Sequence, residues 1–163
     1  MSFAVPSSRA SVIAAAASSA VEPSLYSRLS GLLGLTVPVV SEVDLAQRIE
    51  QGLPVDAVQS LRAQLSLTDA ETATLVAPRR TLHRRASGEQ VLSSQEADRA
   101  IRVARVTARA QEVFVAMPAY VSEWLRTANP QLAQHTPLAM LTTESGARAV
   151  EELLLGLDHG IFA

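Results

Sequence analysis

A short helix, a proline and a second, strongly cationic helix are predicted in succession between residues 68 and 85, and no other part of the chain limits the fold as much. Thr68 and Glu71 have the spacing of a capping box, in which each side chain bonds the other residue's backbone amide. Pro78 then interrupts the helix, and four arginines follow within the seven residues 79–85. This succession favours a helix–turn–helix, whose second helix lies in the major groove of DNA.

The helical step of 100° per residue assigns the arginines to different faces. If Leu82 points into the core, Arg80 and Arg84 point outward. We therefore expect these two side chains to contact bases, since guanidinium groups reach guanine edges in the major groove. The remaining DNA contacts are expected to be with phosphates, and they are assigned to Arg79, Thr81 and Arg85.

The turn between the two helices is unusually short on this assignment. Between Val76 and Arg79 stand only Ala77 and Pro78, whereas a helix–turn–helix has a turn of three or four residues. The sequence leaves two alternatives: the first helix ends before Val76, or the motif is distorted.

The charge distribution supports a polyanion-binding middle of the chain. The protein has 163 residues with a net charge of −2, no lysine and no cysteine. Residues 78–110 hold eight arginines against three acidic residues, whereas residues 1–77 and 111–163 are both acidic. Such asymmetry is typical of a nucleic-acid-binding face, although a solvated arginine face would have the same pattern.

The rest of the chain predicts an all-α fold. Ala, Leu and Arg, its common residues, favour helices, and no strand-like alternation is seen. Residues 1–24, rich in Ala and Ser, are expected to be a disordered arm rather than a signal peptide, because Arg9 is the only early basic residue. No stretch has transmembrane length, and we expect a cytoplasmic protein. Amphipathic spacing predicts helices over 25–34, 41–51, 54–65, 69–76, from 79, 94–115, 119–125, 137–141 and 147–157.

The longest predicted helix follows a second capping box at Ser93 and Glu96. Arg102, Arg105 and Arg109 lie beside its apolar side, and their spacing fits either a solvated face or a contact surface. In the next helix, Trp124 is interpreted as a core anchor.

No arrangement in the sequence is typical of an enzyme. The three histidines, His83, His135 and His159, lie in separate segments without a partner at helical spacing. Glu151 and Glu152 are neighbours, and are therefore interpreted as solvent contacts on different helix faces. We expect no catalytic residue, no metal site and no cofactor.

The order of short motifs resembles the bacterial Xre/MbcA/ParS-type antitoxins, the neutralising half of type II toxin–antitoxin pairs. The resemblance runs from about Leu25 to Ala163 and leaves only the Ala/Ser arm uncovered. No single motif is decisive, but nine follow in the same order. They are GLPVDAVQSLRAQLSL, RTLHRR, LSSQEADRAIRVARV, EVF, EWL, NPQL, TPLAMLTT, GARAVEELL and HGIFA.

The resemblance implies an Xre-like helix–turn–helix part followed by a small helical toxin-binding domain, expected here at residues 25–98 and 99–163. It also implies a homodimer with two partners: a RES-domain toxin that depletes NAD⁺, and the operator DNA of an operon that the antitoxin represses. The C-terminus is expected to obstruct the toxin's active site. The residues carried over for toxin binding are Leu157, His159, Gly160, Ile161 and Phe162.

Two other functions stay open on the sequence. The first is a stand-alone helix–turn–helix transcriptional regulator without a toxin partner. The second is a protein-interaction module in which the arginines are structural, and which would lack the steep salt dependence of phosphate contacts.

Overall fold

The computed structural model describes residues 23–114 and 118–160, and within them every regular element is a helix. The only extended pairing in these two ranges is an isolated bridge between Pro54 and Val91. The predicted all-α class is confirmed. The helices are α1 (Leu25–Leu32), α2 (Glu42–Gln51), α3 (Asp56–Leu65), α4 (Asp69–Leu75), α5 (Arg79–Ser87), α6 (Ser94–Val113), α7 (Pro118–Arg126), the 3₁₀ turn η1 (Pro130–Leu132), α8 (Pro137–Met140) and α9 (Glu144–Asp158).

Both predicted capping boxes are present. The Thr68 hydroxyl accepts the Glu71 amide at 3.1 Å, and the Glu71 carboxylate accepts the Thr68 amide at 2.8 Å. The equivalent bonds join Ser93 and Glu96 at 3.3 and 2.8 Å. These side chains satisfy amides that the first turns of α4 and α6 would otherwise leave unpaired.

The predicted start of the third helix at Pro54 is wrong. α3 begins two residues later, because the preceding residues are held against the segment that leads into α6. The Val55 amide donates to the Gln90 carbonyl at 3.0 Å, and the Leu92 amide donates to the Leu53 carbonyl at 2.8 Å. This pairing ties the two ends of the segment that contains α3, α4 and α5.

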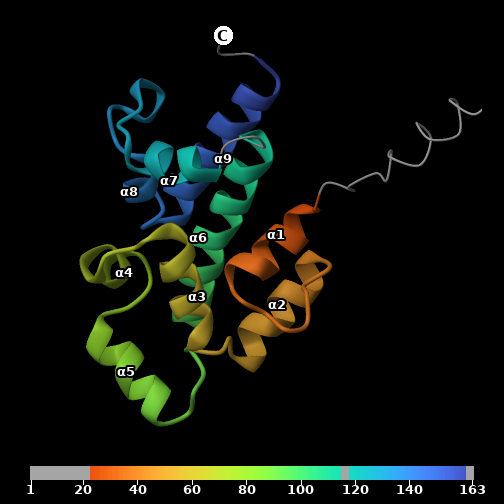
Figure 1. Ribbon diagram of the computed structural model, residues 1–163, viewed down its shortest axis with the longest axis vertical. Coiled ribbons are helices and arrows are strands. Elements are labelled where there is room, and N and C mark those ends of the chain that lie inside the picture. The colour runs from red at the N-terminus through yellow and green to blue at the C-terminus, as the bar shows by residue number, and fades with distance from the viewer. Residues whose placement is uncertain (1–22, 115–117, 161–163) are drawn as a thin grey trace, which may run out of the picture.

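α6 is the central element of the fold (Figure 1), and it contacts α1, α2, α3, α4, α7 and α9. Its predicted apolar stripe is buried where it is described, with Ile101, Ala104 and Ala108 fully inaccessible to solvent. The predicted helix extends to Val115, which lies outside the described residues. Small alanines let neighbouring helices approach α6 closely on several sides.

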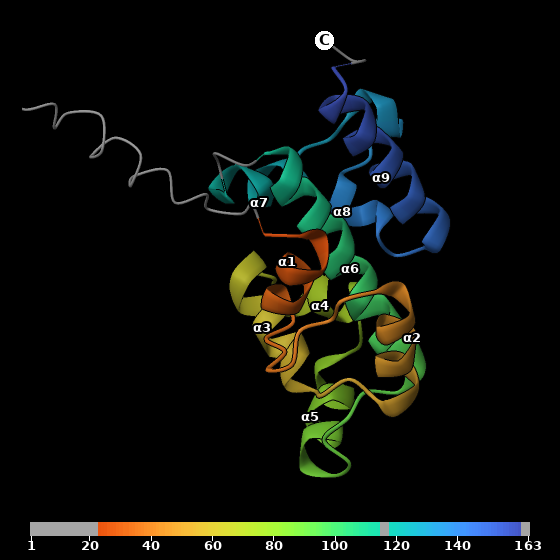
Figure 2. The same cartoon turned by 90° about the vertical axis from the view of Figure 1, so that its right-hand side faces the viewer.

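The helices around α6 form two groups along its length. α1 to α4 pack around its N-terminal half, with α5 beyond them at the end of the molecule, and α7, α8 and α9 gather around its C-terminal half (Figure 2). Trp124 of α7 is 8% exposed and lies 5.4 Å from the Phe114 ring, which confirms its prediction as a core anchor. No described helix is both long enough and apolar enough to cross a bilayer.

Candidate functional site

The predicted helix–turn–helix is formed by α4 and α5. Since α4 ends at Leu75 and α5 begins at Arg79, the turn has three residues. Val76 and Ala77 are buried in it, and Pro78 is exposed. The first of the two alternatives from the sequence is therefore correct: the first helix ends earlier, and the turn has an ordinary length.

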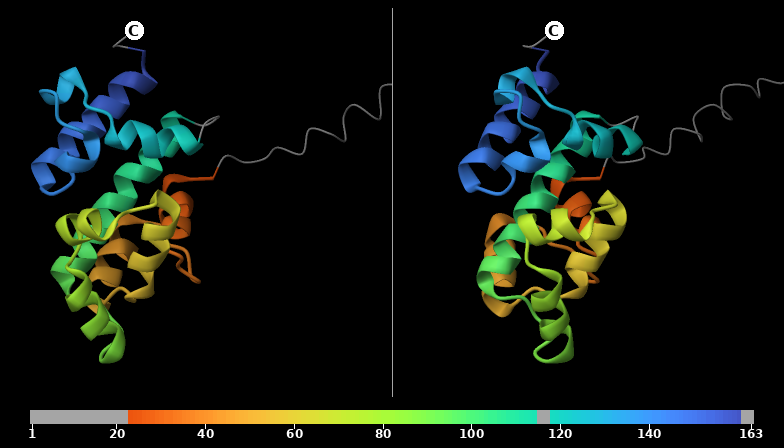
Figure 3. Two further views of the ribbon diagram at one scale, coloured as in Figure 1. Left: turned by 60° about the vertical axis from the view of Figure 1, so that its left-hand side comes forward. Right: turned by 90° about the vertical axis from the view of Figure 1, so that its left-hand side faces the viewer.

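α5 lies at one end of the molecule, farthest from the last turn of α9, in every view (Figures 1 and 3). Leu82 is 3% exposed and anchors this helix in the core. On the other side, Arg80 and Arg84 are exposed, and neither forms a hydrogen bond or ion pair with another described residue. Two guanidinium groups are thus presented to solvent one turn apart on the outermost helix.

The three residues expected to contact phosphates lie in different surroundings. Arg79 leans back toward α4, and its Nη1 lies 3.4 Å from Asp69 Oδ2 while the side chain stays 80% exposed. Thr81 is half-buried. Arg85 is only 23% exposed, with Nε 3.2 Å from Glu96 Oε2 and Nη1 3.3 Å from Glu89 Oε2. Arg85 therefore joins α5 to α6, and its phosphate contact stays a prediction.

The carboxylate of Glu96 is held in its charged form at this junction. Burial raises the pKa of Glu96, but the two hydrogen bonds from Ser93 and the nearby Arg85 guanidinium outweigh that effect. The pKa consequently lies below its usual value. The ionised Glu96 carboxylate offsets the charge of Arg85 at neutral pH, so Arg85 contributes less positive field to the outer face of α5 than Arg80 or Arg84.

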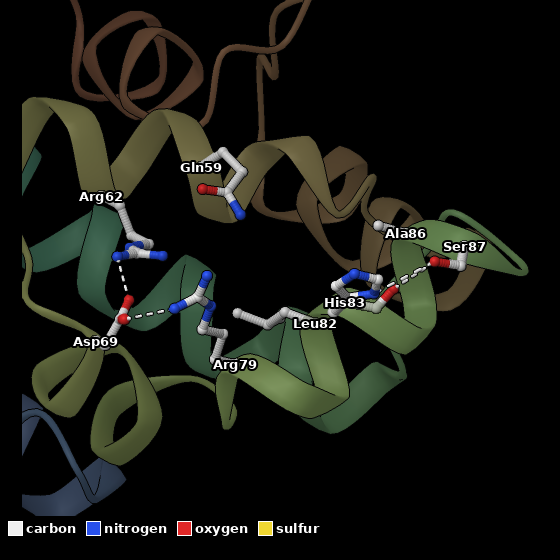
Figure 4. Close-up of a pocket in the computed structure, with 8 residues that line it drawn as sticks. All are labelled: Gln59, Arg62, Asp69, Arg79, Leu82, His83, Ala86 and Ser87. Carbon is white, nitrogen blue, oxygen red and sulfur yellow. Dashed lines mark hydrogen bonds and ion pairs between the residues drawn. The ribbon is translucent and has the colours of Figure 1, made fainter.

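A hollow of about 530 Å³ borders α5 on the side that faces α3. Figure 4 shows side chains entering it from both helices. Arg62 and Arg79 lie on either side of Asp69 at its rim, and both are ion-paired with that carboxylate. The full lining is Gln59, Arg62, Asp69, Arg79, Leu82, His83, Ala86 and Ser87. Arg62 was not predicted from the sequence as a functional residue.

The arginine stripe of α6 is a contact surface at Arg102. This side chain is 13% exposed, with Nη2 2.7 Å from Asp98 and Nε 3.0 Å from Glu144 at the start of α9. The solvated-face interpretation is therefore wrong for Arg102, which joins α6 to α9. Arg109 pairs within its own helix, with Glu112 at 2.9 Å.

The far end of α9 holds the residues expected to bind a toxin. Leu157 packs partly against the core, while His159 and Gly160 are exposed after the last turn. Ile161 and Phe162 lie outside the described residues. Two large apolar side chains that the sequence did not single out are exposed on neighbouring helices: Leu155 of α9 is 43% and Tyr120 of α7 is 41% exposed. Leu155 lies off the buried stripe of α9, and this position was the sequence signal that could have predicted its exposure.

One acidic residue of α9 is not the solvent contact predicted for it. Glu151 is half-buried, and burial raises the pKa of its carboxyl above the usual value, although the charge of Arg105 acts in the opposite direction. Glu152 is exposed, as predicted. Within residues 23–114 and 118–160, no three His, Asp or Glu side chains lie close enough to hold a metal ion.

These features define a class of protein: a helical chain with a helix–turn–helix at one end and a second group of helices at the other. A family model described as the antitoxin Xre-like helix-turn-helix domain matches residues 44–105. A second, described as the antitoxin Xre/MbcA/ParS C-terminal toxin-binding domain, matches residues 109–160.

Relatives that match across both regions give the same assignment. A protein named antitoxin Xre from Pseudomonas putida is 33% identical over 133 residues, 82% of each chain. A protein of that name from Yersinia enterocolitica is 30% identical over 73% of this chain and 81% of the relative, and one from Photorhabdus laumondii is 29% identical over 69% and 77%. The chain belongs to the Xre/MbcA/ParS antitoxin family, with a helix–turn–helix domain and a toxin-binding domain.

Proposed function

We propose that this chain is the antitoxin of a RES-domain toxin that degrades NAD⁺, and that it also represses its own operon as a homodimer. The observation that carries the proposal is the separation of two exposed surfaces. Arg80 and Arg84 lie at one end of the molecule, and the last turn of α9 lies at the other. One chain can therefore hold DNA and a toxin at the same time. The proposed division is residues 25–98 for DNA and 99–163 for the toxin.

Inhibition is proposed to occur by occlusion of the toxin's active site. The proposed contact residues lie at the C-terminal end of α9 and beyond it, and the exposed Leu155 and Tyr120 are added to them. Burying a large apolar side chain in a partner contributes about 1.5–3 kcal/mol, so a few such residues suffice to anchor an obstructing segment. The proposed set from the C-terminus is Leu157, His159, Gly160, Ile161 and Phe162.

Repression is proposed to rest on α5. Arg80 and Arg84 would contact base edges in the major groove of the operator, and a twofold dimer would place two such helices on successive half-sites. The acidic C-terminal part is unsuited to DNA and suited to a protein partner. Both activities belong in the cytoplasm, where operator and NAD⁺ are found, and neither requires catalysis by this chain.

The test is co-expression with the product of the neighbouring gene. We expect that product alone to kill cells and lower their NAD⁺ level, and expect this chain to restore both. The purified chain should also bind a duplex taken from the DNA upstream of its own gene more tightly than a scrambled duplex. A neighbour that is harmless alone, or that stays lethal in the presence of this chain, would refute the toxin partnership. Selective DNA binding would then favour a stand-alone transcriptional regulator.

A further inference from the structure

The hollow between α3 and α5 has several polar and charged side chains in its lining, and it lies on the edge of the exposed arginine face. From α3, Gln59 and Arg62 enter it, and from α5 come Arg79, His83 and Ser87 (Figure 4). Arg79 and His83 immediately precede Arg80 and Arg84 in the sequence. The hollow therefore borders the surface proposed to contact bases, one helical step away.

The charges at the rim of the hollow do not cancel. Two guanidinium groups, those of Arg62 and Arg79, share the single carboxylate of Asp69. The Asp69 side chain is 51% exposed and that of Arg62 is 25% exposed, so solvent reaches both. Solvent-exposed ion pairs are weak, whereas a phosphate group accepts strong, bidentate hydrogen bonds from guanidinium groups. A phosphate that reaches this rim can replace the carboxylate.

We propose that this hollow is a binding site for a phosphate of the DNA backbone. Arg62 and Arg79 hold the phosphate, and Asp69 is the counter-ion that keeps the two guanidinium groups together in the free protein. The inference rests on the proposed DNA-binding function of α5. It adds to the DNA contacts a residue of α3, 17 positions before Arg79 in the sequence and thus outside the arginine cluster.

The position of the hollow favours a DNA strand over a free anion. A helix that lies in the major groove has a sugar–phosphate strand along each of its sides. On one side of α5, the guanidinium group of Arg85 is already paired with Glu89 and Glu96. The other side is open at the hollow, where Arg79 is 80% exposed. Phosphate contacts of this kind fix the orientation of the protein and are independent of sequence.

The test is the salt dependence of DNA binding by Arg62→Ala, measured on the upstream duplex and on a scrambled duplex. Loss of one phosphate contact should reduce the slope of log K against log[salt] by about 0.9, and should weaken binding about eightfold at about 0.1 M salt. Both duplexes should be affected equally. Arg148→Ala is the matched control, because Arg148 is an exposed arginine of α9 at a distance from α5; it should leave the slope unchanged.

Asp69→Asn tests the counter-ion from the opposite direction. Removing the competing carboxylate should strengthen binding to both duplexes severalfold. An unchanged slope for Arg62→Ala, or weaker binding by Asp69→Asn, would overturn the phosphate site. Arg62→Gln, which keeps most of the side-chain stem, and a thermal melt of each variant separate a local effect from unfolding. If the wild-type chain binds neither duplex, the proposed DNA-binding function itself fails along with this site.

Inorganic phosphate, titrated at constant ionic strength, tests the other source of the same chemistry. It should raise the Tm of the wild type no more than that of Arg62→Ala. A rise in the wild type alone, combined with an unchanged DNA salt slope for the variant, would assign the hollow to a free anion and contradict the proposal.

Discussion

Gly146 lies where α8 and α9 of the toxin-binding part approach each other closely. Its amide donates to the Thr143 hydroxyl at 3.0 Å, which caps the start of α9. A Cβ atom at this position would overlap the carbonyl oxygen of Met140, at the end of α8. That atom belongs to the backbone and cannot rotate away. The residue is glycine because the turn between α8 and α9 leaves no volume for a side chain.

We therefore expect Gly146→Ala to lower the free energy of unfolding by about 2–3 kcal/mol, the cost of forcing a backbone shift in a packed region. The measurement is urea denaturation. Gly31→Ala is the matched control, since a Cβ on this α1 residue meets no atom within 4 Å. That exchange should be neutral or stabilise by up to about 1 kcal/mol. Equal stability of the two variants would contradict the described contact between α8 and α9.

Among the elements, α7 is joined to the helix–turn–helix by the side chain of Arg126. Arg126 donates from Nε to Glu71 Oε1 at 2.9 Å, and from Nη2 to Glu71 Oε2 at 3.2 Å and to the Leu65 carbonyl at 3.1 Å. Leu65 is the last residue of α3, where the final carbonyls of a helix have no partner within it, and Glu71 belongs to the capping box of α4. A single guanidinium thus joins α7 to two helices of the DNA-binding part.

The ion pair between Arg126 and Glu71 should weaken at acidic pH. Burial raises the pKa of Glu71, but hydrogen bonds from Arg126 and Thr68 outweigh that effect, so the pKa lies below its usual value. A carboxyl group whose pKa is lower in the folded than in the unfolded protein stabilises the fold at pH values above the unfolded-state pKa. That stabilisation is lost as the pH falls through the folded-state pKa. We expect Glu71→Gln to be less stable than the wild type at neutral pH, by about 1 kcal/mol.

The difference should shrink as the pH falls below 4.5, because the wild-type carboxylate becomes protonated while the amide does not change. Urea midpoints measured between neutral pH and about pH 3 give this comparison. Glu50→Gln, an exposed residue of α2, controls for the loss of one negative charge. A constant difference between Glu71→Gln and the wild type at all pH values would argue against the ion pair between Arg126 and Glu71.

The sequence could predict those features that depend on residues three or four positions apart. Both capping boxes belong here, as does the face of α5 that buries Leu82 and exposes Arg80. The features it could not predict join residues brought together by the fold. Arg126 and Glu71 are 55 positions apart, and nothing local indicates their contact. In the same way, nothing in the sequence indicates that Arg85 is bound to Glu96 or that Arg62 lines the hollow beside α5.

At the scale of the whole molecule, the two proposed activities should be separable by mutation because they lie at opposite ends of the fold. Arg80→Ala combined with Arg84→Ala should abolish selective binding to the upstream duplex and leave protection from the toxin intact, since both residues are exposed and unpaired among the described residues. A chain that ends at Asp158 keeps α9 whole. It should bind DNA normally and fail to protect cells.

Gel shift and cell survival, measured on both variants, check this pair of outcomes. Loss of both activities in either variant, together with a lowered Tm, would indicate unfolding rather than separate surfaces. Protection by the chain ending at Asp158 would move the blocking surface to residues upstream, where Leu155 and Tyr120 are exposed.

The two regions matched by the family models meet inside α6, at residues 105 and 109, and the residues between them are Val106, Thr107 and Ala108. All three are fully inaccessible to solvent, within a helix about 30 Å long. The boundary between the two matched regions therefore lies in the hydrophobic core and is not a hinge. An exchange of one matched region between related genes would have to preserve the packing on every side of α6 at once. We expect partner specificity in such proteins to diverge by point substitutions at the two ends of the molecule, in α5 and after the last turn of α9, rather than by exchange of domains.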